Sequence, residues 1–174
     1  MMMFLEGFLP RAIPDLAFQC VPHEGKHDLE KSVPRKLRAW KEPGVRFVVV
    51  IDNDGAPCKR TKTKLEKLCE RAGRADTLVR IACQELEAWY LGDCDALARV
   101  FEDDALRELA GKPTYANPDA VVGPSDHLRQ RIPRFQKISS ARQMGGSMAV
   151  DEARNRSRSF QVFVSGVRAL AAIS

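Results

Sequence analysis

Hydrophobic residues recur at two spacings along the chain, and together they predict short strands alternating with helices. Apolar residues three or four apart predict helices from the first residues to Pro10, over residues 25–40 with a break at Pro34, and over residues 57–73. Unbroken apolar runs predict strands over residues 47–51 and 77–83, and a shorter one over 17–21. Four of the five residues in the 47–51 run are β-branched, which is typical of a parallel strand covered on both faces.

The order of these elements predicts the fold class. Strand, helix and strand in succession indicate a βαβ unit with a parallel sheet. The spacing of apolar residues becomes helical over residues 84–90 and predicts short helices over residues 93–109. Residues 113–124 are rich in the proline, glycine and asparagine that are typical of turns. Gly145-Gly146 predicts a further turn, and a last helix is expected after an N-cap at Ser157 or Ser159. We therefore predict one α/β domain over residues 1–174, with a short, mainly parallel sheet flanked by helices and a basic, mostly helical segment over residues 111–174.

Composition narrows the class of protein. At 174 residues, 44% hydrophobic and 7% aromatic, the chain is typical of one globular domain. No apolar run approaches the roughly 18 residues that a membrane span needs, and no basic segment precedes the first apolar residues. Five cysteines without a C-x-x-C spacing fit neither a disulfide framework nor a zinc ribbon. We expect reduced thiols and a cytoplasmic protein.

Positive charge is concentrated near the end of the chain. The formal net charge is +5, and residues 126–158 hold eight basic side chains against three acidic ones, so the rest of the chain is neutral. Such a segment suits a polyanion such as nucleic acid, although runs of charge more often form a solvated surface.

Two aspartates follow the strongest predicted strand. Asp52 and Asp54 stand where open α/β sheets place their ligands, and a carboxylate pair can hold one Mg²⁺ or Mn²⁺. In the alternative structural interpretation, Asp52 ends the strand and Asp54 caps the next helix. The segment lacks the further ligands of an EF-hand. A haloacid-dehalogenase motif would need a hydroxyl residue where Ala56 stands.

A second acidic pair, Glu85 and Glu87, follows the next predicted strand. In a helix the two side chains would point about 200° apart, so only one could face the aspartates, whereas an extended segment would place both on one face. The alternative is a solvated pair at a helix start, where acids are favoured. Leu86, Trp89 and Tyr90 are expected to form the packed side of this helix.

Three blocks of sequence resemble a known family. They are Asp52-Asn53-Asp54 with Cys58-Lys59, the run from Gln84 to Asp93, and Ala153-Arg154-Asn155-Arg156-Ser157-Arg158-Ser159-Phe160. Together they resemble the bacterial family known as domain of unknown function 4276, which is described as Toprim-like. The resemblance implies a Toprim-like fold, with carboxylates that hold Mg²⁺ for phosphoryl transfer, and a role in phage or mobile-element defence. Members begin with a strand that ends in an acidic residue. This sequence starts in the following helix, so we expect either that Met1-Met2-Met3 marks a wrongly assigned start or that the chain is a truncated member, and Glu6 is no equivalent of the missing carboxylate.

The sequence thus predicts a Mg²⁺-dependent, nuclease-like protein acting on nucleic acid. Asp52 and Asp54 are the expected metal ligands, Glu85 and Glu87 the expected catalytic carboxylates, and Arg154, Arg156 and Arg158 the expected phosphate contacts. The alternative is a non-catalytic nucleic-acid-binding or adaptor protein that works with a separate ATPase or nuclease.

Overall fold

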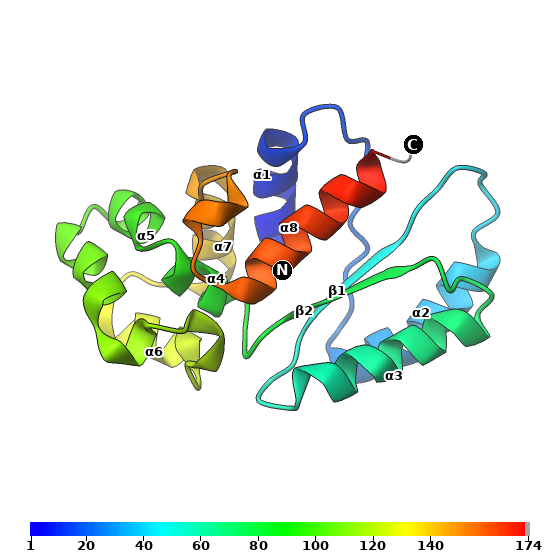
Figure 1. Cartoon of the computed structure of the whole chain (residues 1–174), viewed down its shortest axis with the longest axis horizontal. Helices are drawn as coiled ribbons and strands as arrows, with labels where there is room; N and C mark the ends of the chain where they lie inside the picture. The colour runs from blue at the N-terminus through cyan, green and yellow to red at the C-terminus, as the bar shows by residue number, and fades with distance from the viewer. Residues whose placement is uncertain (173–174) are drawn as a thin grey trace.

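Two parallel strands lie at the centre of the protein in the computed structural model, which describes residues 1–172 (Figure 1). Strand β1 (Val48–Asp52) pairs with β2 (Leu78–Ala82) in a register that places Val48 beside Leu78 and Asp52 beside Ala82. Helix α3 (Cys58–Arg71) connects the strands. The predicted α/β class and the short parallel sheet flanked by helices are confirmed.

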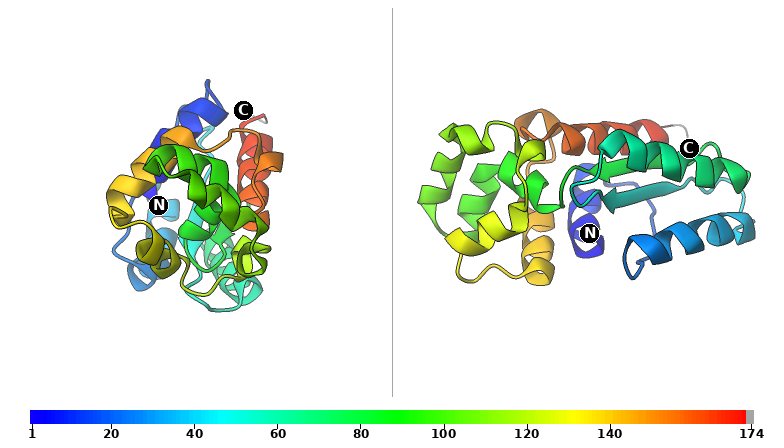
Figure 2. Two further views of the ribbon diagram at one scale, coloured as in Figure 1. Left: turned by 90° about the vertical axis from the view of Figure 1, so that its left-hand side faces the viewer. Right: turned by 90° about the horizontal axis from the view of Figure 1, so that it is seen from below.

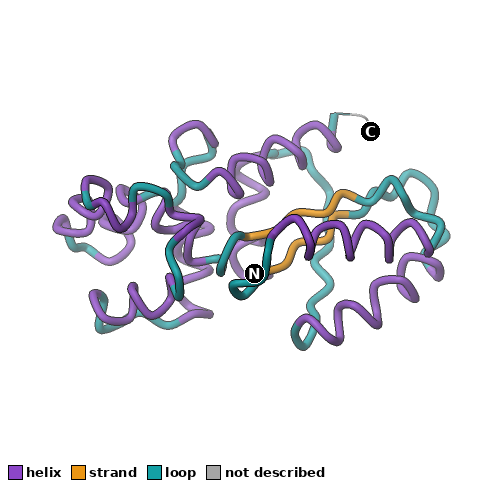
Figure 3. Tube along the Cα trace, turned by 60° about the horizontal axis from the view of Figure 1, so that its bottom comes forward, coloured by secondary structure: helices purple, strands orange, loops and turns teal. Residues whose placement is uncertain are grey.

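Helices cover both faces of this sheet, as Figures 2 and 3 show. Helices α2 (Lys26–Ala39) and α3 pack on the face that holds Val49, Val79 and Ile81. Helix α8 (Arg158–Ala171) runs along the other face, where the Arg80 side chain donates a hydrogen bond to its Val162 carbonyl (3.0 Å). Of the β1 side chains only that of Val49 is buried. A strand buried on both faces was the wrong expectation, because α8 packs mainly on β2 and leaves the β1 side chains on its face partly exposed.

The remaining helices form a second core beside the carboxyl ends of the strands. They are α1 (Met2–Ala12), α4 (Glu87–Gly92), α5 (Cys94–Phe101), α6 (Pro124–Arg131) and α7 (Lys137–Ser147), with short 3₁₀ turns at Asp104–Gly111, Pro113–Tyr115, Pro118–Ala120 and Glu152–Arg154. Trp89 lies at the centre of this core, with the rings of Phe4, Phe160 and Phe163 at 5.6, 5.4 and 5.0 Å. This core fixes α4, and with it the residues at the end of β2.

Three local expectations were wrong, and each was overridden by packing. Helix α2 continues through Pro34, because its buried Leu29, Val33 and Leu37 hold one straight face against the sheet. Residues 17–21 are irregular, since no neighbouring strand supplies backbone partners. Gly145-Gly146 lies inside α7 and is not a turn.

No helix within residues 1–172 is both long and apolar enough to cross a membrane. All five cysteines are free, as the sequence predicted.

Candidate functional site

The loops after β1 and β2 lie side by side because the strands are parallel and end together. The Asn53 amide N–H donates to the Ala82 carbonyl (3.3 Å), and that of Asp54 donates to the Gln84 carbonyl (3.0 Å). The buried Asn53 side chain donates to the Ala56 carbonyl and accepts from the Gln84 amide, so it clamps both loops. Asp54 and Gln84 both adopt left-handed backbone conformations, with φ of 48° and 67°. Asn53 is a site residue that the sequence interpretation missed.

Asp52 ends β1 with a carboxylate that the fold leaves without a partner. Its Oδ1 atom is buried and accepts no hydrogen bond from any described residue. Burial, reinforced by the negative charge of Glu87, raises the pKa of Asp52 to about 7. A buried polar atom without a partner is rare, and Asp52 therefore marks a place where a cation or a polar group would be favoured.

Glu87 and Tyr90 extend this buried polar cluster from α4. Glu87 is the first residue of the helix and only 3% exposed, and burial raises its pKa. One turn later the Tyr90 hydroxyl is buried and has no hydrogen-bond partner among the described residues. Burial and the charges of Glu87 and Asp52 raise the pKa of Tyr90 well above its ordinary value. We refer to Asp52, Glu87 and Tyr90 as the buried acidic cluster.

Glu85 points to different partners. One carboxylate oxygen accepts from the Ser125 amide N–H (2.9 Å) and the other from Lys137 Nζ (3.0 Å). Although burial opposes ionisation, these two hydrogen bonds lower the pKa of Glu85, and the bond from Lys137 in turn raises the pKa of that lysine. Lys137 lies 52 residues along the chain, at the start of α7, so it brings a positive charge next to the acidic loops.

The structural interpretation of the aspartates is half right: Asp52 does end β1, but the expected helix cap at Asp54 is wrong. Helix α3 begins after Pro57 with no side-chain cap, so Asp54 does not cap it, and Asp54 is exposed on the loop. The two glutamate side chains have different partners, as expected where a helix begins. The charge of Glu87 acts on Asp52, whereas Glu85 accepts a hydrogen bond from Lys137. Within residues 1–172, no three His, Cys, Asp or Glu side chains are arranged to hold a metal ion. The Asp52 oxygen without a partner is suited to a hard cation. Among the described residues, however, only Asp52 and Glu87 could serve as carboxylate ligands at this place, and a third ligand is not supplied.

The last sequence block holds α8 against α4. The Asn155 side chain donates to the Trp89 carbonyl (2.9 Å) and accepts from the Ser157 amide (2.8 Å). A side chain at Gly92 would overlap that of Asn155. Ser157 caps α8, as predicted. The Ser159 hydroxyl, which accepts from Trp89 Nε1 (2.8 Å), donates to the Asp119 carboxylate (2.9 Å). The blocks around Trp89 and Asn155 are therefore two sides of one buried interface.

A family model with the description "Domain of unknown function (DUF4276)" matches residues 2–168. The chain belongs to this family. No curated protein and no solved structure matches the chain. The DUF4276 match spans the paired loops, the buried acidic cluster and the Trp89–Asn155 interface.

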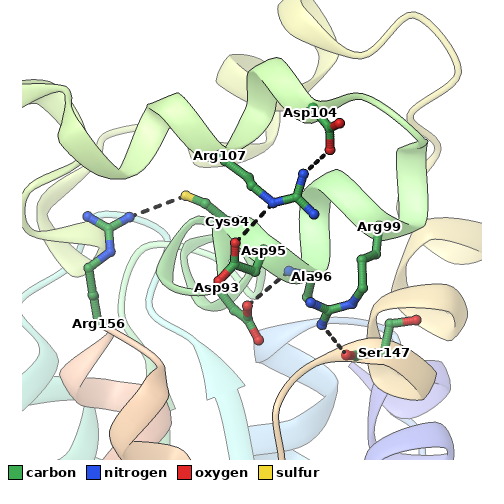
Figure 4. Close-up of polar contacts among 9 residues, drawn as sticks. All are labelled: Asp93, Cys94, Asp95, Ala96, Arg99, Asp104, Arg107, Ser147 and Arg156. Carbon is green, nitrogen blue, oxygen red and sulfur yellow. Dashed lines mark hydrogen bonds and ion pairs between the residues drawn. The ribbon is translucent and has the colours of Figure 1, made fainter.

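Two of the three arginines expected at phosphates are free to make such contacts in this DUF4276 chain. Arg154 and Arg158 are exposed, and among the described residues the Arg158 side chain hydrogen-bonds only to Gln161 (3.1 Å). Arg156 instead donates to the carbonyls of Leu91, Ala110 and Tyr115 and to Cys94 Sγ (3.3 Å), the last contact shown in Figure 4. Its guanidinium joins these segments through hydrogen bonds and is therefore not available to phosphates.

A second basic surface lies next to the acidic loops, and the sequence interpretation missed it. Helix α3 starts six residues after Asp52 and carries six basic residues against two acidic ones. A small pocket beside Ala56 is lined by Lys26, Arg60 and Lys64. Periodicity alone could have shown that the buried face of α3 leaves these charges on the outside.

Proposed function

We propose that the protein binds nucleic acid at the carboxyl edge of the sheet and cleaves phosphodiester bonds there with the help of Mg²⁺. The observation that carries the proposal is the half-buried Asp52 carboxylate, whose buried Oδ1 atom has no partner among the described residues and whose charge is close enough to the buried Glu87 to interact with it. Mg²⁺ is commonly held by only one or two protein carboxylates, with substrate phosphates and water completing its shell. Asp52 and Glu87 are therefore sufficient for a site that is completed by its substrate. A Toprim-like relationship, with Asp52 and Asp54 as its Asp-x-Asp pair, belongs to the same proposal.

Each nearby side chain has a role in this reaction class. Asp52 and Glu87 would hold the cation, which supplies Lewis-acid polarisation of a phosphoryl oxygen. Lys137, fixed by Glu85, would neutralise charge on the phosphate. The buried Tyr90 hydroxyl, which has no partner among the described residues, would be available to donate to a ligand of the cation. Arg154, Arg158 and the basic surface of α3 would contact flanking phosphates.

The non-catalytic alternative is favoured by one observation. Within the described residues, the carboxylates do not form a three-ligand group. A protein that only binds nucleic acid, beside a separate ATPase or nuclease, would need the basic surfaces but not the buried acidic cluster.

A magnesium titration separates the two functions. At fixed ionic strength, a tenfold excess of Mg²⁺ over its dissociation constant should stabilise the native protein by about 1.4 kcal/mol, measured by thermal unfolding. The shift should vanish in Asp52→Asn and persist in Arg60→Ala, which changes an exposed side chain of α3. Labelled DNA and RNA, single- and double-stranded, should be cut by the native protein with Mg²⁺ and not by Asp52→Asn. Binding without a magnesium shift and without cleavage would establish the alternative.

The exposed arginines are tested by the salt dependence of binding. Replacing Arg154 and Arg158 together by alanine should reduce the slope of log affinity against log salt by about two, because two phosphate contacts and their released counterions are lost. The matched control replaces Arg38 and Lys41, which are exposed near the end of α2, and should leave the slope unchanged. Equal slopes in both double variants would show that Arg154 and Arg158 do not touch the nucleic acid.

A further inference from the structure

Two cysteines meet at the base of the paired loops. Cys58 is the first residue of α3 and Cys83 is the first residue after β2, and their Sγ atoms are 2.6 Å apart although 25 residues separate them in sequence. Both are half-buried and free. Neither belongs to the proposed metal or phosphate contacts.

The fold holds both cysteines in place. The Cys83 amide N–H donates to the Ser159 hydroxyl (3.3 Å), which belongs to the Trp89–Asn155 interface. Cys58 opens a helix whose Thr61, Leu65 and Cys69 are buried. The pair therefore meets through tertiary packing and not through a flexible loop.

The other three cysteines have no such partner. Among the described residues, Cys58 and Cys83 are the only cysteines whose sulfur atoms contact each other. Cys94 Sγ donates to the Leu91 carbonyl and accepts from Arg156, while Cys69 is buried in the core between the sheet and α2 and α3.

We propose that Cys58 and Cys83 are a redox modification site, at which a peroxide converts the thiol pair to a reversible intramolecular disulfide. The proposal is independent of the proposed nuclease function. A disulfide bond is about 2.05 Å long, so the two sulfur atoms need to approach only slightly to form it. The other cysteines would remain reduced.

The chemistry balances with hydrogen peroxide as the oxidant. One thiolate attacks a peroxide oxygen, the O–O bond breaks, and a sulfenic acid and hydroxide form. The second sulfur then attacks the sulfenic sulfur, the S–O bond breaks, the S–S bond forms, and its thiol proton leaves with the hydroxide as water. In total two thiols lose two electrons and two protons, and the peroxide becomes two waters. A small dithiol reverses the modification by thiol–disulfide exchange.

The full chain can be tested by mass spectrometry. The reduced protein is exposed to hydrogen peroxide, its remaining thiols are alkylated, and the protein is digested without reduction. We expect one linked peptide pair, Cys58 with Cys83, a mass lower by two hydrogens, and three alkylated cysteines. Cys58→Ser should abolish the linked pair, whereas the matched Cys20→Ser should retain it.

Thermal unfolding supplies a second measurement that does not depend on any variant folding. Because the bridge closes a loop of 25 residues, the oxidised native protein should melt about 10 °C higher than the reduced one, and a dithiol should reverse the shift. Linked peptides joining other cysteines, or oxidation of Cys58 to a sulfinic acid without a linked pair, would overturn the proposal.

Discussion

Asp52→Asn is expected to stabilise the metal-free protein by about 2–4 kcal/mol at pH 8, which is unusual for a substitution at a buried polar position. The wild-type carboxylate must ionise in a buried place next to Glu87, and this holds its pKa at about 7 against an ordinary value of 3.8. Asparagine has nearly the same shape but no charge to desolvate. The substitution therefore removes an unfavourable ionisation without opening a cavity.

The pH dependence of this increase in stability should show that it comes from the ionisation of Asp52. A carboxyl group whose pKa is higher in the folded protein than in the unfolded chain contributes stability that is complete below about pH 4 and is lost as the pH rises through about 7. Wild type and Asp52→Asn should thus have similar free energies of unfolding at pH 4. The difference should grow between pH 4 and 7 and level off above 7. Urea unfolding at several pH values, with a chelator present, measures it directly.

Asp54→Asn is the matched control for this experiment. Asp54 is exposed and its left-handed backbone is one that asparagine tolerates, so its stability should change by less than about 0.5 kcal/mol at every pH. If Asp52→Asn instead destabilised the protein by a constant amount across the pH range, the carboxylate would have a structural hydrogen-bond partner and the proposed cation site would lose its main support.

The energetic cost at Asp52 connects stability with the proposed function. At neutral pH the metal-free protein retains two carboxylates, the half-buried Asp52 and the buried Glu87, whose pKa values are both raised. A bound cation would offset this repulsion, so the same residue that lowers the stability of the empty site would increase its affinity for Mg²⁺.

Local sequence patterns predicted the parts of the site that depend on one strand and the residues next to it. The β-branched run before Asp52 and the second strand before Glu85 placed four carboxylates at one edge of a parallel sheet, and the structure has all four near that edge. The helical start at Glu87 decided which glutamate turns inward. These features follow from periodicity and from the direction of parallel strands.

The partners of those carboxylates could not be predicted in this way, because they come from distant segments. Ser125 and Lys137 reach Glu85 from 40 and 52 residues away. Asp119 meets Ser159 across another 40 residues. A run of basic residues also gave no indication that the Arg156 guanidinium would bind backbone carbonyls, because that depends on how the 3₁₀ turns and α-helices pack. Charge patterns describe composition, whereas hydrogen bonds require the tertiary structure.

The glycine pair in α7 shows how distant packing changes the meaning of a local pattern. Helices α1 and α7 cross where Gly7 faces Gly145, and a Cβ atom built at Gly7 would lie 3.1 Å from the Gly145 carbonyl carbon. A Cβ at Gly145 would overlap the Phe4 carbonyl oxygen and lie 3.1 Å from the Phe4 Cα. The next residue, Gly146, has nothing within 4 Å of its own Cβ position. The crossing fixes α7, whose first residue Lys137 reaches Glu85.

Gly145→Ala is therefore expected to destabilise the protein by about 3 kcal/mol, because the added methyl group meets backbone atoms of α1 that cannot rotate away. Gly146→Ala is the matched control in the same helix. It should stabilise the protein by about 0.5–1 kcal/mol, since alanine restricts the unfolded chain and fits an open helical position. Urea unfolding of both variants at one pH measures the difference. Similar stability of the two variants would show that α1 does not approach α7 at Gly145, and the position of Lys137 beside the acidic loops would then lack its structural support.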